Sequence, residues 1–353
     1  MSPSIVQLVG PQAEILVRAT NWIGDAIMTL PAVRSIRENF PQARITVLAQ
    51  PWVADIFSAN PHVDRVLLYH KKGRHAGLPG KWRLARELAK ERFELAILLQ
   101  NAFEAALLCR LAGIPLVAGY NRDARRPLLS HPVAVSREIK AGHQVYYYQQ
   151  LLAGLGLTPG ADRLYLSLAK TDRDWADDFV RPLPRPLIGL NPGAAYGPAK
   201  RWPAARYGEA ARELLAKTGG TCLIFGTPDD RQAAATIGEW IGPAAVDLCG
   251  RTSLAQAMAL IGRCQVFITN DSGLMHVAAA QDTPLVAIFG STDPVATGPF
   301  SERAVVVSKS LPCSPCLKTN CPLGFECMRT ITATEVASAA WGLLSQGDAG
   351  SRL

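Results

Sequence analysis

The chain has 353 residues, of which 48% are hydrophobic and 19% are charged, a composition typical of globular proteins and not of disordered ones. This length exceeds what one hydrophobic core usually serves, so we expect two domains. No apolar run reaches the roughly 20 residues needed to span a bilayer, and no basic-then-apolar signal peptide opens the chain. We therefore expect a soluble protein of the cytosol.

The excess of positive charge belongs to the first half of the chain. The formal net charge is +8; residues 1–150 contain 19 Lys and Arg against 11 Asp and Glu, whereas residues 151–353 contain 18 of each class. This asymmetry indicates that the first half faces an anionic partner, either a phosphorylated lipid, a membrane surface or a nucleic acid. A solvated basic surface without a partner is the alternative.

Strands and helices alternate along the first half. Pro31 either kinks the first predicted helix or lies in the first turn of its regular part. The alternation is typical of a doubly wound parallel sheet. Apolar runs predict strands, and apolar residues at three-to-four-residue spacing predict helices. The predicted strands are 14–19, 45–49, 65–69, 95–99 and 116–119. The predicted helices are 25–39, 82–92 and 102–111.

The same rhythm restarts after a helix at 145–155 and a proline-rich segment at 181–186, which we interpret as the domain linker. We thus predict an α/β protein with two Rossmann-like domains at 1–180 and 187–330, followed by a C-terminal helix and tail at 331–353. The predicted strands of the second half are 187–190, 222–225, 246–248, 266–269 and 285–289, and the helices are 204–217, 230–240, 254–262, a short one ending at 280, and 334–344.

The segment 265–294 is the clearest candidate for a ligand site. It parses as a strand, a turn at 270–273, a short helix and a second strand. A strand that feeds a glycine turn at a helix N-terminus offers backbone N–H groups and the positive dipole end to an anion, which we predict to be the diphosphate of a nucleotide-sugar. In the alternative, Asp271 or Ser272 merely caps the helix. His276 either donates to the diphosphate or is packed in the interior.

The loop at 191–203 follows the first strand of the second half. Gly193, Ala194 and Ala195 are small enough for a ligand to approach the backbone, and Lys200 with Arg201 offers positive charge to phosphate. A flexible surface loop with a basic end is the alternative. Neither G-x-G-x-x-G nor G-x-x-x-x-G-K-[ST] occurs in its expected place, which argues against a dinucleotide dehydrogenase and a P-loop ATPase.

Two carboxylates follow predicted strands, at the edge where α/β folds bind ligands. Asp25, after the first strand, either takes a proton from a substrate hydroxyl or interacts with a helix dipole. Asp230, after the strand at 222–225, either binds ribose hydroxyls or caps the next helix.

Four cysteines near the C-terminus, Cys313, Cys316, Cys321 and Cys327, form a C-x₂-C-x₄-C-x₅-C pattern. Four thiolates so close in sequence can hold a structural zinc ion tetrahedrally. The spacing matches none of the usual zinc ribbons, so an iron–sulfur site, a disulfide or reduced thiols are the alternatives. We do not expect a catalytic metal.

Three segments resemble the ADP-heptose:lipopolysaccharide heptosyltransferases of glycosyltransferase family 9, most closely those of the heptosyltransferase II type. They are NWIGD at 21–25, PGA at 192–194 with GPAKRWP at 197–203, and TNDSGLMHVAAA at 269–280. The resemblance extends from about residue 14 to residue 345. It implies a GT-B fold, in which two Rossmann-like domains face each other across a cleft. The donor nucleotide would bind the C-terminal domain, the acceptor the N-terminal one, and the last helix would cross back to the first domain.

The resemblance also implies the roles of particular residues. It makes Asp25 the general base and Lys200 a catalytic contact to the donor phosphates, and we place Asn21, Trp22 and Gly24 at the acceptor. The donor-binding residues that we predict are Gly193, Ala194, Ala195, Lys200, Asp230, Thr252, Asp271, Ser272, Gly273 and His276.

The implied reaction is an inverting, metal-independent transfer of L-glycero-D-manno-heptose from ADP-heptose onto heptosyl-Kdo2-lipid A, in lipopolysaccharide inner-core biosynthesis. We expect a cytoplasmic monomer that needs no cofactor, binds no nucleic acid and meets its phosphorylated acceptor by peripheral contact at the inner leaflet of the inner membrane. The alternatives are a heptosyltransferase I or III with another core acceptor, a nucleotide-sugar epimerase on the same fold, and a non-catalytic nucleotide-sugar- or lipid-binding module.

Overall fold

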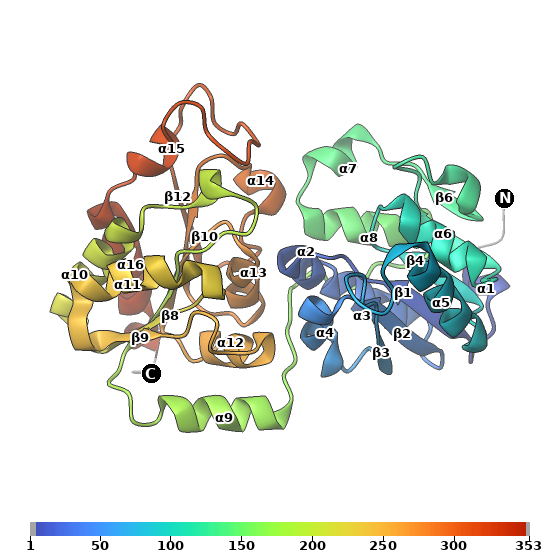
Figure 1. Cartoon of the computed structure of the whole chain (residues 1–353), viewed down its shortest axis with the longest axis horizontal. Coiled ribbons are helices and arrows are strands. Elements are labelled where there is room, and N and C mark those ends of the chain that lie inside the picture. The colour runs from blue at the N-terminus through green and yellow to red at the C-terminus, as the bar shows by residue number, and fades with distance from the viewer. Residues whose placement is uncertain (1–4, 351–353) are drawn as a thin grey trace. The chain divides into compact units, whose positions relative to one another are not determined.

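The computed structural model describes residues 5–350, which form two compact units (Figure 1). The first unit ends at Ser167 and the second begins at Leu168. Each unit contains one six-stranded sheet, and the paired strands of both sheets run parallel. The predicted α/β class with two Rossmann-like sheets is confirmed.

The sheet of the first unit has the order β3-β2-β1-β4-β5-β6. Its central strands are buried on both faces, because the helices of the crossover connections cover both sides of a parallel sheet. The strands are β1 (Glu14–Arg18), β2 (Arg44–Ala49), β3 (Arg65–Leu68), β4 (Leu95–Leu98), β5 (Leu116–Tyr120) and β6 (His131–Val133).

The helices of the first unit follow the strands in alternation. Helices α2, α3, α4 and α8 contact one another in pairs, and α5 packs on α6. Among residues 5–350 no helix is both long and apolar enough to span a membrane. The helices are α1 (Ile5–Leu8), α2 (Ile23–Met28), α3 (Leu30–Asn39), α4 (Pro51–Ser58), α5 (Gly77–Lys90), α6 (Phe103–Leu111), α7 (Arg137–Ala141) and α8 (Gln144–Gly154).

The sheet of the second unit has the order β12-β11-β10-β7-β8-β9. Counted from its own first strand, this is the same order as in the first unit, so the two units share one topology without a recognisable sequence repeat. The strands are β7 (Leu187–Asn191), β8 (Thr221–Ile224), β9 (Ala245–Asp247), β10 (Val266–Asn270), β11 (Leu285–Phe289) and β12 (Ala304–Ser308).

Figure 1 shows α10, α11 and α16 on one side of this second sheet and α12 and α13 on the other. α16 packs on α10 and on β10 and β11; the predicted return of this helix to the first domain stays a prediction. The helices are α9 (Lys170–Val180), α10 (Ala204–Thr218), α11 (Arg231–Ile241), α12 (Leu254–Ile261), α13 (Gly273–Ala280), α14 (Pro294–Thr297), α15 (Glu326–Arg329) and α16 (Ala333–Gly350).

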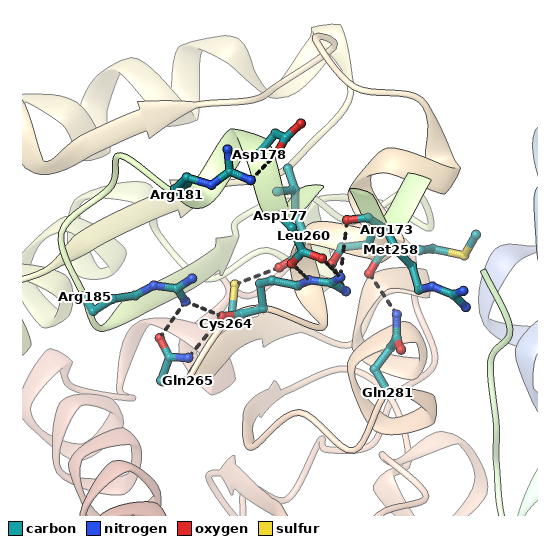
Figure 2. A network of polar contacts seen from close by, with 12 residues as sticks. Arg173, Asp177, Asp178, Arg181, Arg185, Met258, Leu260, Cys264, Gln265 and Gln281 are labelled. Carbon is teal, nitrogen blue, oxygen red and sulfur yellow. Dashed lines mark hydrogen bonds and ion pairs between the residues drawn. The ribbon is translucent and has the colours of Figure 1, made fainter. Parts of the chain in front are cut away.

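Helix α9 belongs to the second unit, although the predicted domain boundary at 180 assigns it to the first. Figure 2 shows Arg173 and Asp177 of α9 beside Met258 and Leu260 of α12. The guanidinium of Arg263, just after α12, forms a two-pronged ion pair with the Asp177 carboxylate, with N–O distances of 2.8 and 2.9 Å. Because these contacts hold α9 on α12, the division between the units precedes α9.

The helix predicted at 25–39 is two helices. α2 ends at Met28 and α3 begins at Leu30, and between them the Thr29 hydroxyl donates to the Ala26 carbonyl at 2.6 Å. Pro31 lies in the first turn of α3, where its missing N–H removes no intrahelical hydrogen bond.

Helix α5 begins at Gly77, earlier than the predicted start at residue 82. Gly77, Pro79 and Gly80 suggest a loop by composition, yet proline is tolerated in a first helical turn. Gly80 is required by packing, because a Cβ there would lie 2.2 Å from the carbonyl carbon of His75. The edge strands β6 and β12 are also absent from the predicted elements, and their side chains are mostly half-buried or exposed.

Candidate active site

In both sheets most of the predicted functional residues lie at the topological switch point; Asp230 and Thr252 follow β8 and β9 instead. The first strand of each unit lies beside the fourth, which places β1 beside β4 and β7 beside β10. In open α/β sheets, ligands bind outside the carboxyl ends of the strands at this point. Residues 21–25 follow β1, residues 192–203 follow β7, and residues 271–273 follow β10. Each of the three segments therefore begins where this fold favours a ligand.

Asn270, the last residue of β10, holds the loop that follows β7. Its buried amide donates to the Pro192 carbonyl at 2.7 Å, and its Oδ1 accepts from the Trp202 backbone N–H and from the Tyr207 hydroxyl, both at 3.0 Å. These bonds tie both ends of the loop at 192–202 to the neighbouring strand. The predicted site residues do not include Asn270, which the sequence analysis assigned to the turn at 270–273 and which the structure places at the end of β10.

Asn191 links the end of β7 to the start of α13. Its Oδ1 accepts from Ser272 Oγ at 2.7 Å and from Thr269 Oγ1 at 3.2 Å. Ser272 Oγ in turn accepts from the Met275 backbone N–H at 3.4 Å, so Ser272 is the N-cap of α13 and Gly273 is its first residue. The cap consumes one of the first N–H groups of this helix, and the remaining ones carry the positive end of its dipole.

Lys200 and Asp271 form an ion pair at the start of α13. Lys200 Nζ lies 2.6 Å from Asp271 Oδ2, and the Thr292 hydroxyl donates to the same oxygen at 2.6 Å. The exposed fractions of the two charged side chains are 14% and 6%, and the ammonium also lies 4.8 Å from the centre of the Tyr196 ring. An ammonium has three N–H donors, so Lys200 retains capacity for a further acceptor, such as a phosphate oxygen.

The predicted Gly193, Ala194 and Ala195 lie in the same loop, but only Ala195 is exposed. Gly193 is required by packing, because a Cβ there would lie 2.6 Å from Asp230 Oδ2. That oxygen accepts from the Thr227 N–H at 2.9 Å and from its hydroxyl at 2.8 Å, while Oδ1 faces Arg201 at 3.5 Å, an ion-pair distance without a hydrogen bond. Capping at Thr227 thus provides hydrogen bonds to Asp230 Oδ2 and leaves Oδ1 without one among residues 5–350.

Thr252 and His276 complete the predicted donor set. Thr252 is half-buried in the connection between β9 and α12, and the carboxyl end of β9 lies at the same edge of the sheet as β7 and β10. His276 is buried in the first turns of α13. The structure thus gathers the loop residues, Lys200, Asp271, Ser272 and Gly273 in one place. It leaves Thr252 in a separate loop.

The cysteine-containing segment supports the loop that carries Lys200. The Leu317 carbonyl accepts from the Tyr196 hydroxyl at 2.8 Å, and the Thr319 carbonyl accepts from the Ala199 N–H at 3.1 Å. Gly197 packs on this segment so closely that a Cβ there would lie 2.4 Å from the Thr319 carbonyl oxygen. The segment therefore has a mechanical role beside the candidate site, which the sequence pattern did not reveal.

The metal site predicted at the four cysteines is not supported. All four are free thiols: Cys313 is exposed, Cys316 and Cys321 are half-buried, and Cys327 is buried. In the part of the chain that the structure describes, no three His, Cys, Asp or Glu side chains are arranged to hold a metal ion. Cys327 is directed into the core, where its Sγ packs close to Gly290, and burial raises its pKa.

In the first unit, the loop after β1 is held by an arginine and a tryptophan. The Asn21 side chain accepts from Arg18 at 3.1 Å, and the Asn21 carbonyl accepts from the Trp52 indole at 2.7 Å. Trp22 is 58% exposed and Gly24 is buried. Of the three predicted acceptor residues, Trp22 therefore offers the largest surface to a ligand.

Asp25 is half-buried in the first turn of α2. Its charge reaches Tyr148 of α8, whose pKa is raised well above its ordinary value, first by burial and then by Asp25. This partly accessible carboxylate lies beyond the carboxyl end of a central strand, at the edge where α/β folds bind ligands. Tyr148 is a neighbour that sequence reasoning missed, since it lies on a helix far along the chain.

Glu104 joins three elements at the same edge of the first sheet. Its carboxylate accepts from Lys81 at 2.7 Å, Tyr69 at 2.8 Å and Lys71 at 3.1 Å. Burial alone would raise the pKa of Glu104, but these donors lower it to about 2. Beside the Tyr69 ring lies buried Arg18, whose pKa is lowered by burial to about 10. This edge of the first unit therefore combines the buried Arg18 with a fixed charged cluster.

Two parallel sheets of Rossmann order in separate units are the architecture of glycosyltransferases of the GT-B class. Residues 81–325, more than half of the chain, match the profile of glycosyltransferase family 9 (heptosyltransferase). The chain belongs to this family.

The sequence and the structure both have close relatives in it. The chain is 32% identical to lipopolysaccharide heptosyltransferase 2 of Salmonella typhimurium and 33% identical to that of Escherichia coli K12, in both cases over 83% of this chain and 87% of the relative. The solved structure of E. coli ADP-heptose lps heptosyltransferase II has a TM-score of 0.78 at 29% identity, covering 95% of this chain and 99% of that one. A glycosyltransferase family 9 structure from Veillonella parvula has a TM-score of 0.85 at 27% identity, covering 95% and 98%.

Proposed function

We propose that this enzyme transfers L-glycero-D-manno-heptose from ADP-heptose onto heptosyl-Kdo2-lipid A, with inversion at the anomeric carbon. The observation that carries the proposal is the Lys200–Asp271 ion pair at the capped start of α13. It presents a cation and a helix N-terminus together, as a departing diphosphate requires. The relatives named as lipopolysaccharide heptosyltransferase 2 support a heptose as the transferred sugar and lipopolysaccharide as the class of acceptor.

The donor binds the second unit in this proposal. Lys200 contacts a phosphate oxygen with the N–H capacity that Asp271 and Tyr196 leave, and the backbone N–H groups that begin at Gly273 contact another. The loop that Asn270 ties down lies beside the nucleotide. Asp230 and Thr252 lie at the same edge, toward the ribose.

The acceptor binds the first unit. Asp25 takes the proton from the attacking acceptor hydroxyl, the oxygen forms a bond to the anomeric carbon, and the bond from that carbon to the phosphate oxygen breaks, releasing ADP. Trp22, exposed beside Asn21, packs on the acceptor. A single displacement needs one base and no protein nucleophile, which agrees with the one carboxylate found after β1.

The acceptor is a phosphorylated glycolipid, so we place the enzyme in the cytoplasm, at the inner leaflet of the inner membrane by peripheral contact. The net positive charge of residues 1–150 supports this, since it suits a phosphorylated or membrane-bound partner. We propose that it works as a monomer. Addition of EDTA to the transfer reaction tests whether turnover is independent of a divalent metal.

The decisive experiment measures ADP release with ADP-heptose and each of three acceptors: Kdo2-lipid A and the same molecule carrying one or two heptoses. We expect turnover with the acceptor that carries one heptose. Turnover only with one of the others would assign the chain to another heptosyltransferase type, and no turnover with any would contradict the proposal. A reaction with donor alone tests for epimerisation, because an epimer formed without acceptor would show a different reaction class.

A further inference from the structure

A short segment of the first unit combines many cations with exposed apolar side chains. Residues 71–86, KKGRHAGLPGKWRLAR, contain six Lys and Arg and no Asp or Glu. The segment follows β3 and includes the start of α5, so it lies at the carboxyl edge of the first sheet, the same edge as Asp25. We call it the 71–86 segment.

The two large exposed apolar side chains of this segment lie on one face of α5. Leu78 is 81% exposed and Trp82 is 53% exposed, and their i, i+4 spacing places them side by side on the helix. Arg86 continues the same row, while Leu84 and Leu88 face the core. A large exposed leucine and tryptophan in one row cost free energy in water, which points to a partner that covers them.

The segment is held in a defined shape. His75 is buried, accepts from the His70 N–H at 3.2 Å and contacts Glu87 through Nε2 at 3.1 Å. Gly80 packs directly against the His75 backbone, so only glycine fits at the first turn of the helix. Leu78 and Trp82 are therefore exposed on an ordered surface and not on a loose loop.

The charges of the segment divide into two groups. Lys71 and Lys81 pair with Glu104, and Arg74 lies 3.6 Å from Glu87. The other three, Lys72, Arg83 and Arg86, are exposed and form no ion pair with residues 5–350. Arg83 and Arg86 lie on the same helix as Leu78 and Trp82, and Lys72 precedes it, so the segment carries positive charge that no ion pair within residues 5–350 neutralises.

We propose that the 71–86 segment is a membrane-contact surface that inserts Leu78 and Trp82 into the headgroup region of a bilayer with anionic lipids. Tryptophan and leucine beside Lys and Arg are the composition of interfacial helices, in which apolar burial and attraction to anionic headgroups act together. The proposal rests on the proposed function, because a bilayer-embedded acceptor makes contact at this edge useful. It names the surface responsible for that contact.

Sedimentation of the full-length protein with vesicles tests the proposal without donor or acceptor. We expect binding to vesicles of phosphatidylglycerol and phosphatidylcholine, weak binding to pure phosphatidylcholine, and loss of binding as salt is raised. Leu78→Ser/Trp82→Ser and Lys72→Glu/Arg83→Glu should each weaken binding by more than about tenfold. The matched control is Leu323→Ser/Lys318→Glu in the second unit, where Leu323 is 64% exposed, and it should bind as the wild type.

Equal vesicle binding by the wild type and both 71–86 variants would overturn the proposal. A second arm compares ADP release with acceptor in vesicles and with a deacylated, water-soluble acceptor. We expect the variants to lose activity only with vesicles; an equal loss with both would assign the segment to acceptor recognition instead. If the wild type releases no ADP with either acceptor, the proposed function fails. The vesicle-binding result still shows whether the 71–86 segment contacts a membrane. Thermal unfolding of each variant confirms that it is folded.

Discussion

Lys200 Nζ lies 2.6 Å from Asp271 Oδ2, and the two side chains are largely buried, with exposed fractions of 14% and 6%. The two residues are 71 positions apart in the chain and meet because β7 and β10 are neighbours in the sheet. A buried ion pair is costly to break from one side, since the remaining charge is left without its partner. The pair therefore has a structural role as well as the catalytic one that we propose.

The two roles can be separated. Lys200→Met should lower the free energy of unfolding by about 3 kcal/mol, because Asp271 is left buried without its cation. The double variant Lys200→Met/Asp271→Asn should regain most of that stability, yet both variants should lose about 10²–10³-fold in kcat/KM, because the donor phosphates lose their cation. Urea unfolding and ADP release are the measurements. If the double variant were stable and turned over like the wild type, Lys200 would have no role in the reaction.

Asp25→Asn should lower kcat by about 10²–10⁴-fold, because an amide cannot accept the proton of the acceptor hydroxyl. ADP binding, measured by titration calorimetry, should be unchanged, since the proposed donor residues lie in the second unit. Glu94→Gln is the control: Glu94 is exposed just before β4, at the opposite edge of the sheet, and its removal should leave kcat as in the wild type. Loss of ADP affinity in Asp25→Asn would contradict the assigned role.

Asn270→Ala should destabilise the protein by about 2–4 kcal/mol, because it leaves the buried Pro192 carbonyl, Trp202 N–H and Tyr207 hydroxyl without this partner. We also expect weaker ADP binding and faster protease cleavage within 192–202, the loop that Asn270 holds. Exposed Asn320, which makes only a local turn contact, provides the matched control, and Asn320→Ala should change stability by less than about 0.5 kcal/mol. A loop that remains protected in Asn270→Ala would show that other contacts hold it.

Glu104 makes stability depend on pH at low values. The folded-state pKa of Glu104 is about 2, below its ordinary value of 4.5, so the unfolded chain takes up the proton first as the pH falls. The contribution of ionised Glu104 to the free energy of unfolding is therefore complete above about pH 4.5 and is lost as the pH falls from about 4.5 to about 2. Glu104→Gln should therefore be less stable than the wild type at pH 7, and the difference between them should shrink across this window. A difference in unfolding free energy that is constant with pH would contradict the pairing with Lys71 and Lys81.

Much of the fold follows from patterns that are local in sequence. Buried parallel strands are continuous apolar runs, so β1, β4, β7, β10 and β11 are predicted almost to the residue. Because parallel strands end at one edge of a sheet, the turns after β1, β7 and β10 were expected to hold the ligand, and the structure places them at the two switch points. The basic character of the first half was likewise a property of composition.

The tertiary structure decided which side chains meet. The strand order brings Asn270 to the loop after β7 and Asp271 to Lys200. Tertiary packing also places α9 on α12, although α9 is mostly polar and buries only a narrow face. Among residues 5–350 no three His, Cys, Asp or Glu side chains are arranged to hold a metal ion, so the spacing of the four cysteines was not sufficient to predict a metal site. Backbone conformation depends mainly on near neighbours in the sequence, whereas side-chain partners depend on which strands lie side by side. For this reason the sequence by itself determined the fold class and the strand ends that carry the candidate site, and only the folded chain determined the side-chain pairs found there.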